Sequence, residues 1–490
     1  STVAGRLRTH GVPNDVLGWA IRMDVARGLS GESRKEVGVR RSEEYKEYAV
    51  MTVKELKEKS FGQDVERAAG AALRVARDEA GGLDRPGIKA REPVALARLG
   101  SAVKACVGAA GTLSAAAGGL RHALAAYRQG VLRVDGGLPL DAGRFAQHKN
   151  LVPRALFEAV TSLAERGVTL QARDGAPPGA DQPGPYESAK EVAPDLLLSA
   201  VVDMSRGFGL MLDREGDSHA LEGAWWSAYG AVPKTDPEGT KSGVRPINDL
   251  RPQNAHISAS CAGDEGTGRE APPQRCPSIV DLMRLVVRLA LDNPGVDILV
   301  FKKDLESAFK LLHLNIADAP WQVSELPTEG VPGLGDCRPV AASMVGCFGG
   351  SWWPGFFGVL AWSVVAAQLN RGCAEPELNG SGAFQGTTWV DDFGGVVPRL
   401  GMAPQIATDS YSGLARDFAG NGAINEPKDR REGEPDTRAV MWGFGLDTSR
   451  VRDEGYAGGR VSIPEAKWVK LRNLVTGPAF EHVGKRRVKL

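Results

Sequence analysis

One stretch bears most directly on the fold, Thr387-Thr388-Trp389-Val390-Asp391-Asp392-Phe393-Gly394-Gly395-Val396-Val397. Apolar and β-branched residues on both sides of the Asp-Asp pair predict a β-hairpin whose turn carries both carboxylates. Two carboxylates 4 Å apart repel each other by about 4 kcal/mol at an effective dielectric constant of about 20. Such a pair needs either full hydration, which is usual for a polar turn, or a bound cation.

A third aspartate follows a second predicted strand. Val296-Asp297-Ile298-Leu299-Val300-Phe301 is nearly all apolar, which predicts a buried central strand that ends near Asp304. A helix that starts at Ser278-x-x-Asp281, a capping-box spacing, precedes this strand. If the hairpin pairs beside the strand, Asp304, Asp391 and Asp392 meet. Three such carboxylates suit two Mg²⁺ ions about 3.5–4 Å apart, the arrangement used for in-line nucleotidyl transfer.

Composition limits the remaining possibilities. The chain has 490 residues, 42% of them hydrophobic and 24% charged, which predicts two or more globular units. Neither a signal peptide nor a long uncharged apolar run is evident, so we expect an intracellular protein, cytoplasmic or nuclear, with no membrane partner. The first residue, Ser1, indicates a fragment or a processed product. Six cysteines without a C-x-x-C pair argue against structural zinc, and the 60 basic and 60 acidic residues cancel.

The chain divides by composition into four parts. Residues 1–171 are predicted to form a helical domain, with a capping box at Thr52-x-x-Glu55. No motif in this domain indicates its function. Residues 172–188 are rich in proline and glycine and predict a linker. Residues 189–458 alternate between strand-like and helical segments, and residues 459–490 form a basic tail. The loop from Ser258 to Pro277 reads as an insertion in the third part.

The order of short motifs over roughly residues 225–475 resembles the reverse transcriptases, most closely those of tyrosine-recombinase (DIRS-like) retrotransposons. The following stretches carry the resemblance: Val232-Pro233-Lys234 with Arg245 to Asn254 (fingers), Lys302 to Phe309 (motif A), Phe348 to Pro354 (motif B), Trp389 to Asp392 (motif C), Asn425 to Lys428 (motif D) and Met441 to Phe444 (motif E).

The resemblance implies an α+β right-hand polymerase, with an N-terminal helical domain, fingers and palm over 189–458 and the start of a thumb over 459–490. It implies an RNA-directed DNA polymerase whose partners are dNTPs and a primed RNA or DNA template. Asp304, Asp391 and Asp392 would hold two Mg²⁺ ions, or Mn²⁺. Phe309 would exclude the ribose 2′-hydroxyl. The implied dNTP-binding residues are Lys234, Arg245, Phe309, Phe348, Gly349 and Lys428, and the implied primer grip is Trp442 and Gly443.

Some residues depart from the family pattern. Trp389 stands where tyrosine is usual, Trp442 where leucine is common, and Gly350 with Trp352-Trp353 alters motif B. Because of these bulky residues, an alternative interpretation is an inactive or domesticated protein that binds nucleic acid without catalysis. An RNA-dependent RNA polymerase is a second alternative, which Phe309 opposes. Taken singly, the basic residues would be solvated charges and the phenylalanines core residues. The partners of the N-terminal helices are unknown.

Overall fold

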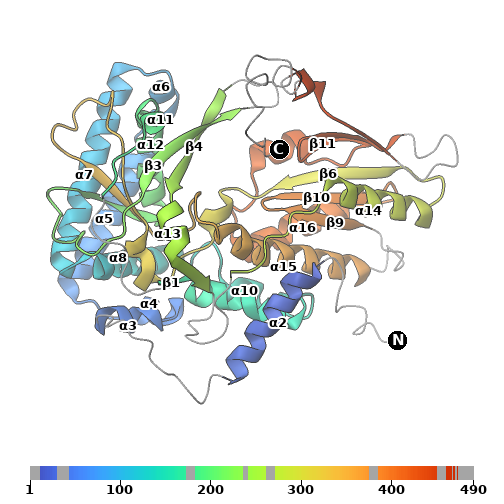
Figure 1. Cartoon of the computed structure of the whole chain (residues 1–490), viewed down its shortest axis with the longest axis horizontal. Helices are drawn as coiled ribbons and strands as arrows, with labels where there is room; N and C mark the ends of the chain where they lie inside the picture. The colour runs from blue at the N-terminus through green and yellow to red at the C-terminus, as the bar shows by residue number, and fades with distance from the viewer. Residues whose placement is uncertain are drawn as a thin grey trace, which may run out of the picture.

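The computed structural model describes residues 12–29, 43–172, 182–235, 241–260, 271–374, 384–449, 459–465, 467–469 and 472. Helices and antiparallel sheets make up these residues, so the predicted α+β class is confirmed at this level. Most of the N-terminal helices lie at one end of the molecule, and the sheet that contains the Asp-Asp hairpin lies toward the other end (Figure 1).

The N-terminal region is helical, as predicted, and three of its helices begin at side-chain caps, Thr52, Asp84 and Asp141. The Thr52 hydroxyl accepts a hydrogen bond from the Glu55 backbone N–H, and the Glu55 carboxylate accepts one from the Thr52 backbone N–H at 2.8 Å. The helices are α2 (Asn14–Leu29), α3 (Glu43–Ala49), α4 (Val53–Glu58), α5 (Gln63–Gly81), α6 (Arg85–Lys89), α7 (Pro93–Ala117), α8 (Leu120–Asp135), α9 (Ala142–Phe145), η1 (Ala146–His148) and α10 (Arg154–Arg166).

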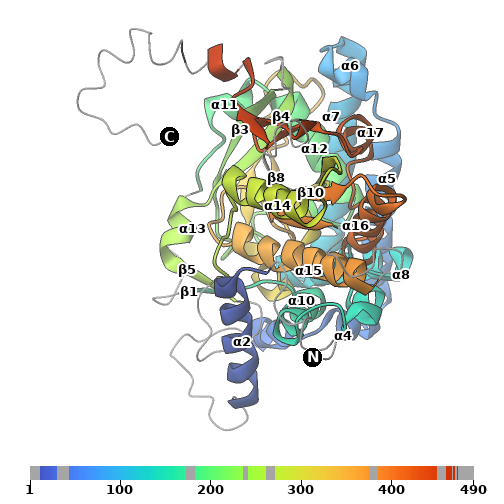
Figure 2. The same ribbon diagram turned by 90° about the vertical axis from the view of Figure 1, so that its right-hand side faces the viewer.

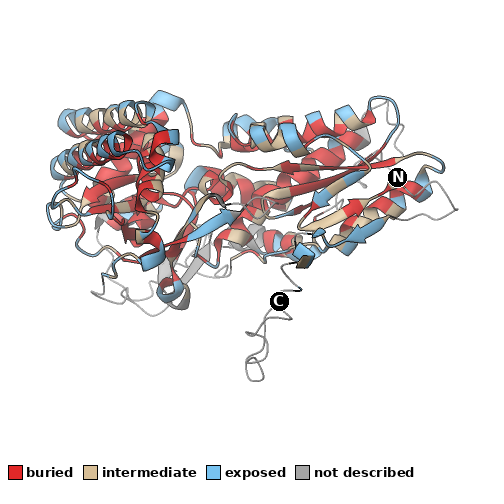
Figure 3. Ribbon diagram, turned by 90° about the horizontal axis from the view of Figure 1, so that it is seen from above, coloured by how far each residue is buried: buried red, intermediate tan, exposed pale blue. Residues whose placement is uncertain are grey.

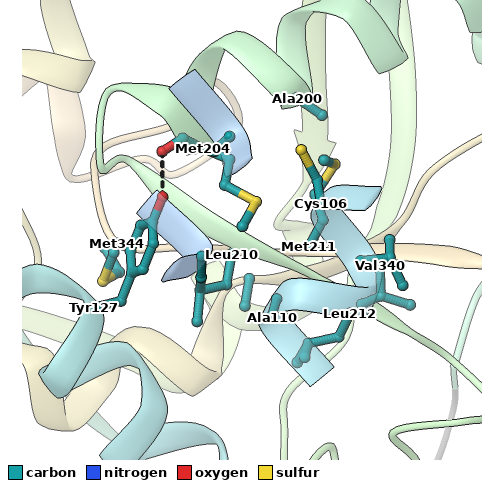
Figure 4. Close-up of a cluster of buried hydrophobic side chains, with 14 of the residues drawn as sticks. Cys106, Ala110, Tyr127, Ala200, Met204, Leu210, Met211, Leu212, Val340 and Met344 are labelled. Carbon is teal, nitrogen blue, oxygen red and sulfur yellow. Dashed lines mark hydrogen bonds between the residues drawn. The ribbon is translucent and has the colours of Figure 1, made fainter. Parts of the chain in front are cut away.

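These helices do not have a core of their own. Buried residues from 45–138 and from 189–344 form one continuous hydrophobic cluster, part of which is shown in Figure 4. The Tyr127 hydroxyl donates to the Met204 carbonyl at 2.7 Å, and the buried Arg128 guanidinium donates to the carbonyls of Leu314 and Met344 at 2.7 and 2.6 Å. The boundary predicted at 172–188 therefore does not separate two cores, and residues 173–181 lie outside the described residues.

Helix α7 alone among the described residues is long and apolar enough to cross a membrane. Its Leu99, Val103 and Cys106 are fully buried in the shared core, whereas Lys104 on another side of the helix is exposed. This distribution is that of a helix packed on one side against the protein.

The described residues that follow the N-terminal helices include the strands of three small antiparallel sheets. They are β2–β8–β7, the hairpin β3–β4 and the pair β1–β5. Only residues 261–270 of the predicted insertion lie outside the described residues, and its first residues belong to β5. The elements are β1 (Thr169–Ala172), α11 (Glu187–Lys190), α12 (Ala193–Ser205), β2 (Gly209–Asp213), β3 (Ala228–Thr235), β4 (Lys241–Asp249), α13 (Arg251–His256), β5 (Ile257–Ser260), η3 (Ile316–Trp321), β7 (Val323–Glu325) and β8 (Pro339–Ser343).

The central sheet has the strand order β6–β10–β9 and carries a helical layer on each face. Because side chains alternate along a strand, Ile298 and Val300 of β6 pack with α14, while Leu299 and Phe301 pack with α15 and α16. In the view of Figure 2, α14 lies above α15, and Figure 3 shows buried strands between helices whose outer sides are exposed. The elements are α14 (Ile279–Asp292), β6 (Ile298–Asp304), α15 (Trp353–Ala374), β9 (Gln385–Trp389), β10 (Asp392–Pro398) and α16 (Ala403–Ala419).

The C-terminal part adds a short helix and a third three-stranded sheet, β11–β12–β13. Most of the predicted basic tail, including residues 473–490, lies outside the described residues. The remaining elements are η2 (Ala308–Leu311), α17 (Glu426–Glu432), β11 (Arg438–Met441), β12 (Phe444–Asp447) and β13 (Arg460–Ser462).

Candidate active site

Strand pairing brings the three aspartates together. Strands β9 and β10 form the predicted hairpin, but only one of the two carboxylates lies in its turn, which consists of Val390 and Asp391. Asp392, also predicted in the turn, is the first residue of β10, because it pairs with Trp389 across the hairpin. Strand β10 then pairs with β6 so that Asp392 lies directly opposite Asp304. The Leu305 backbone N–H donates to the Asp391 carbonyl at 3.0 Å, which fixes the turn against the end of β6.

The two faces of this strand pair differ, because one carries charged side chains and the other is packed with apolar ones. Lys302 and Asp304 of β6 lie on the same face because they are two residues apart. On the opposite face, Phe393 is fully buried and stacks on Tyr411 with ring centroids 4.0 Å apart. Apolar packing behind the sheet thus holds the carboxylates in place on its front.

Three non-glycine residues around the carboxylates have positive φ angles. They are Ser307 (φ 58), Val390 (φ 54) and Trp442 (φ 48). A β-branched residue such as valine is disfavoured there, so the turn that presents Asp391 is strained. Strain of this kind persists only where surrounding contacts fix the backbone, and it clusters at functional sites.

Two lysines and an asparagine contact the aspartates. Lys428 Nζ lies 2.6 Å from Asp304 Oδ1 and 3.3 Å from Asp392 Oδ1. Lys302 Nζ lies 3.1 Å from Asp392 Oδ1, and the Asn425 side-chain amide donates to Asp304 Oδ2 at 3.1 Å. The sequence motifs predict a role for Lys428 but none for Lys302 or Asn425. A signal for Lys302 is present in the sequence, because the alternation of side chains along β6 puts it on the same face as Asp304.

The protonation equilibria follow from burial and from these partners. Burial, together with the neighbouring Asp392, raises the pKa of Asp304 to about 6, against the lowering effect of Lys428. Burial and Asp392 also raise the pKa of Asp391. Burial raises the pKa of Asp392 too, but Lys302 and Lys428 outweigh it and hold this pKa below its usual range. The site therefore has more buried carboxylate than its two lysines neutralise, which favours an additional cation.

An open cavity of 2290 Å³ lies in front of the carboxylates. It is large enough for a nucleotide together with part of a nucleic-acid strand, since drug-sized ligands occupy about 300–1,000 Å³. Of the residues predicted from the sequence, Gly349 alone is missing from its lining. The others that line it are Lys234, Arg245, Asp304, Phe309, Phe348, Asp391, Asp392, Lys428, Trp442 and Gly443.

Two phenylalanines and an arginine form one wall of the cavity. Phe309 packs edge-on against Phe348 with ring centroids 5.0 Å apart, and is 9% exposed. The Arg245 guanidinium lies 4.9 Å from the centre of the Phe348 ring. This cation–π contact holds the guanidinium at the cavity, where it can meet an anionic ligand.

Gly349 acts through the backbone. Its φ is 120°, and a Cβ at this position would lie 1.8 Å from the Asn248 carbonyl oxygen. The Asn248 backbone N–H donates to the Phe348 carbonyl at 2.9 Å, and the Asn254 side chain bonds both the Gly349 carbonyl and the Ser351 N–H. Gly349 thus lets the loop that carries Phe348 lie against β4. The two asparagines that hold this loop were not singled out from the sequence.

Trp442 and Gly443 form the turn between β11 and β12, close to the aspartates. Both have positive φ, 48° and 86°, as a type I′ hairpin turn requires. The Trp442 indole N–H donates to the Asp392 carbonyl at 3.3 Å, and the Trp442 ring lies 5.7 Å from that of Trp389. Trp389 and Trp442, two of the departures from the reverse-transcriptase pattern, therefore contact each other beside the carboxylates.

The donor set suits Mg²⁺, which prefers carboxylate oxygens. Over the described ranges, however, no three His, Cys, Asp or Glu side chains are already gathered as a metal-binding group. The Lys428 ammonium lies between Asp304 and Asp392, so these oxygens fit a divalent cation once Lys428 withdraws. No protein-family model and no curated protein matches the chain.

Proposed function

We propose that the protein is an RNA-directed DNA polymerase. The observation that carries the proposal is the convergence of Asp304 with the Asp391-Asp392 pair at the edge of one large cavity. In this proposal the β6–β10–β9 sheet is the palm of a right-hand polymerase, the β3–β4 hairpin belongs to the fingers, and β13 precedes the thumb. The motif order described above supports the same assignment.

The reaction joins a primer 3′-oxygen to the α-phosphorus of a dNTP and breaks the bond from that phosphorus to the leaving pyrophosphate. Asp304, Asp391 and Asp392 would hold the divalent cations. Bound cations of this kind activate the attacking hydroxyl and neutralise charge on the leaving group. Burial lowers the pKa of Lys428, but Asp304 and Asp392 outweigh burial and raise it above the usual value. Lys428 is therefore protonated, and it can supply a proton to pyrophosphate.

The nucleotide would lie along the wall formed by Arg245, Phe348 and Phe309. Arg245 and Lys234 line the cavity and match the charge of a triphosphate. The Phe309 ring is fixed by Phe348 on one side and by Phe357, 6.0 Å away, on another. A ring held in this way cannot turn aside for a ribose 2′-hydroxyl, which favours dNTPs and opposes an RNA polymerase.

A primer-extension assay on an RNA template tests the proposal. We expect the wild-type protein to extend the primer with dNTPs and Mg²⁺, and Asp391→Asn to reduce the rate by more than about 100-fold, since even outer-shell partners of a metal contribute about 10- to 100-fold. Asp409→Asn is the matched control, because Asp409 is an exposed carboxylate on α16 that bonds Gln405. Equal extension by wild type and Asp391→Asn would contradict the proposal.

The second candidate is a nucleic-acid-binding protein of the same fold without catalysis. The Trp389–Trp442 pair favours it, because Trp389 is 39% exposed and an aromatic surface beside the carboxylates can stack on bases without any chemistry. Binding of a dNTP separates the two candidates. A polymerase binds the nucleotide more tightly when Mg²⁺ is added, whereas the non-catalytic protein binds nucleic acid with no such dependence.

A further inference from the structure

The side chains of helix α17 contact the rest of the molecule mainly through ion pairs, whereas the backbone just before the helix is bonded to β6, from the Asn425 N–H to the Asp304 carbonyl at 3.0 Å. None of its seven residues is buried. Asp429 pairs with Lys303 at 2.7 Å, and Glu426 pairs with Arg416 at 2.7 Å. Side chains held by ion pairs rather than by apolar packing can change partners without exposing hydrophobic surface. The side chains of α17 can therefore respond to the charges that they meet.

Residues at the start of α17 bond the carboxylate oxygens that a metal ion would need. Lys428 Nζ donates to Asp304 Oδ1, and the Asn425 side-chain amide donates to Asp304 Oδ2. Asp392 Oδ1 is shared between Lys428 and Lys302. Asn425 also caps α17, because its side-chain oxygen accepts from the Lys428 backbone N–H at 3.2 Å. A divalent cation that approaches Asp304 thus meets oxygens already engaged by one helix end.

We propose that Lys428 is a built-in counter-ion of the carboxylates, which competes with the divalent cation and moves to the triphosphate when cation and nucleotide bind together. This inference rests on the proposed function. Lys302 remains with Asp392, since it belongs to the β6 strand and its side chain is only 11% exposed. Lys428 is the exchangeable partner because it belongs to α17.

The exchange follows from charge balance. An ammonium and a divalent cation repel each other, so both cannot share the space between Asp304 and Asp392. A nucleotide triphosphate brings new negative charge to the same cavity and gives Lys428 another partner. Without a nucleotide, the cation has to displace Lys428 unaided. The structure therefore predicts weak cation binding in the absence of nucleotide and stronger binding in its presence.

Mn²⁺ binding to the full chain without nucleotide tests the inference, with free Mn²⁺ measured by electron paramagnetic resonance. Lys428→Met keeps the length of the side chain and removes its charge, and we expect it to bind Mn²⁺ at least about tenfold more tightly than wild type. Lys428→Gln should also bind more tightly. Arg430→Gln is the matched control, because it removes one positive charge from an exposed position of α17, and should bind Mn²⁺ nearly as wild type does.

The outcomes distinguish this inference from the proposed function. Tighter binding by both Lys428 variants, with the control unchanged, supports the inference. Equal or weaker Mn²⁺ binding by the Lys428 variants overturns the inference. If Asp304→Asn abolishes Mn²⁺ binding in the same experiment, the metal site of the proposed function still stands. An equal gain by Arg430→Gln also overturns it, because general charge would then explain the effect. If neither wild type nor Lys428→Met binds Mn²⁺, both the inference and the metal site of the proposed function fail.

Discussion

The Gly349→Ala substitution tests how the wall of the cavity is held. The added Cβ would lie 1.8 Å from the Asn248 carbonyl oxygen, and the φ of 120° is unfavourable for any residue with a side chain. The loop would have to shift, and its hydrogen bonds to Asn248 and Asn254 would break. Backbone strain of about 1–3 kcal/mol and about 1 kcal/mol for each lost hydrogen bond predict a total near 4 kcal/mol.

Gly358→Ala provides the matched control. Gly358 lies in α15, and a Cβ there would meet nothing closer than the Trp362 ring at 3.9 Å. Alanine is a better helix former than glycine, so this substitution should stabilise the protein by up to about 1 kcal/mol. Both free energies of unfolding can be measured by urea denaturation followed by tryptophan fluorescence. If Gly349→Ala were as stable as wild type, or if both variants lost equal stability, this account of the loop would be wrong.

The same variant has a consequence for the cavity. Because Phe348 precedes Gly349 and packs against both Phe309 and Arg245, a shifted loop would displace the contact surface for the nucleotide. We expect the KM for dNTP to rise in Gly349→Ala under conditions where it remains folded. An unchanged KM would separate the loop from nucleotide binding.

Three further predictions concern the residues around the carboxylates. Phe309→Val should raise the use of rNTPs relative to dNTPs by about tenfold or more in single-nucleotide incorporation, because it removes the ring that meets the 2′-hydroxyl; an unchanged ratio would refute the steric role. Mn²⁺ affinity should fall by up to about tenfold for each pH unit below 6, because burial raises the pKa of Asp304 to about 6 and protons compete with the cation for its oxygens. The affinity should level off above pH 7. A flat profile from pH 5 to 7 would contradict this assignment. Val390→Gly should change the free energy of unfolding by less than about 1 kcal/mol in the same urea assay, because relief of the positive φ offsets the lost contacts. Val397→Gly is the control at a fully buried position of β10, and it should cost about 3 kcal/mol. A large loss for Val390→Gly would mean that its turn is not strained.

Local signals in the sequence predicted local structure well. The capping boxes at Thr52 and Ser278 mark helix starts, and the apolar run before Asp304 forms β6 as expected. The two-residue turn that contains Asp391 was evident from its flanking strand formers. These features depend on residues close in the sequence, so periodicity and caps suffice to find them.

Contacts between distant segments were not predictable in the same way. The proline-rich composition of residues 172–188 predicts a linker, but it does not indicate that the helices before it pack against the residues after it. The restriction at Gly349 comes from Asn248, which lies on another element. Asn425 caps α17 through a local contact, but its bond to Asp304 depends on the tertiary fold. In each case the missing information is which surfaces meet.

The central claim is that Asp304, Asp391 and Asp392 hold the cations for nucleotidyl transfer. The most direct measurement is anomalous diffraction from crystals grown with Mn²⁺, a primer–template and a non-hydrolysable dNTP analogue. We predict two Mn²⁺ peaks about 3.5–4 Å apart, within coordination distance of Asp304 and Asp391, with Lys428 turned toward the triphosphate. Ordered nucleotide with no Mn²⁺ at these carboxylates, and Lys428 still bonded to Asp304, would contradict the account.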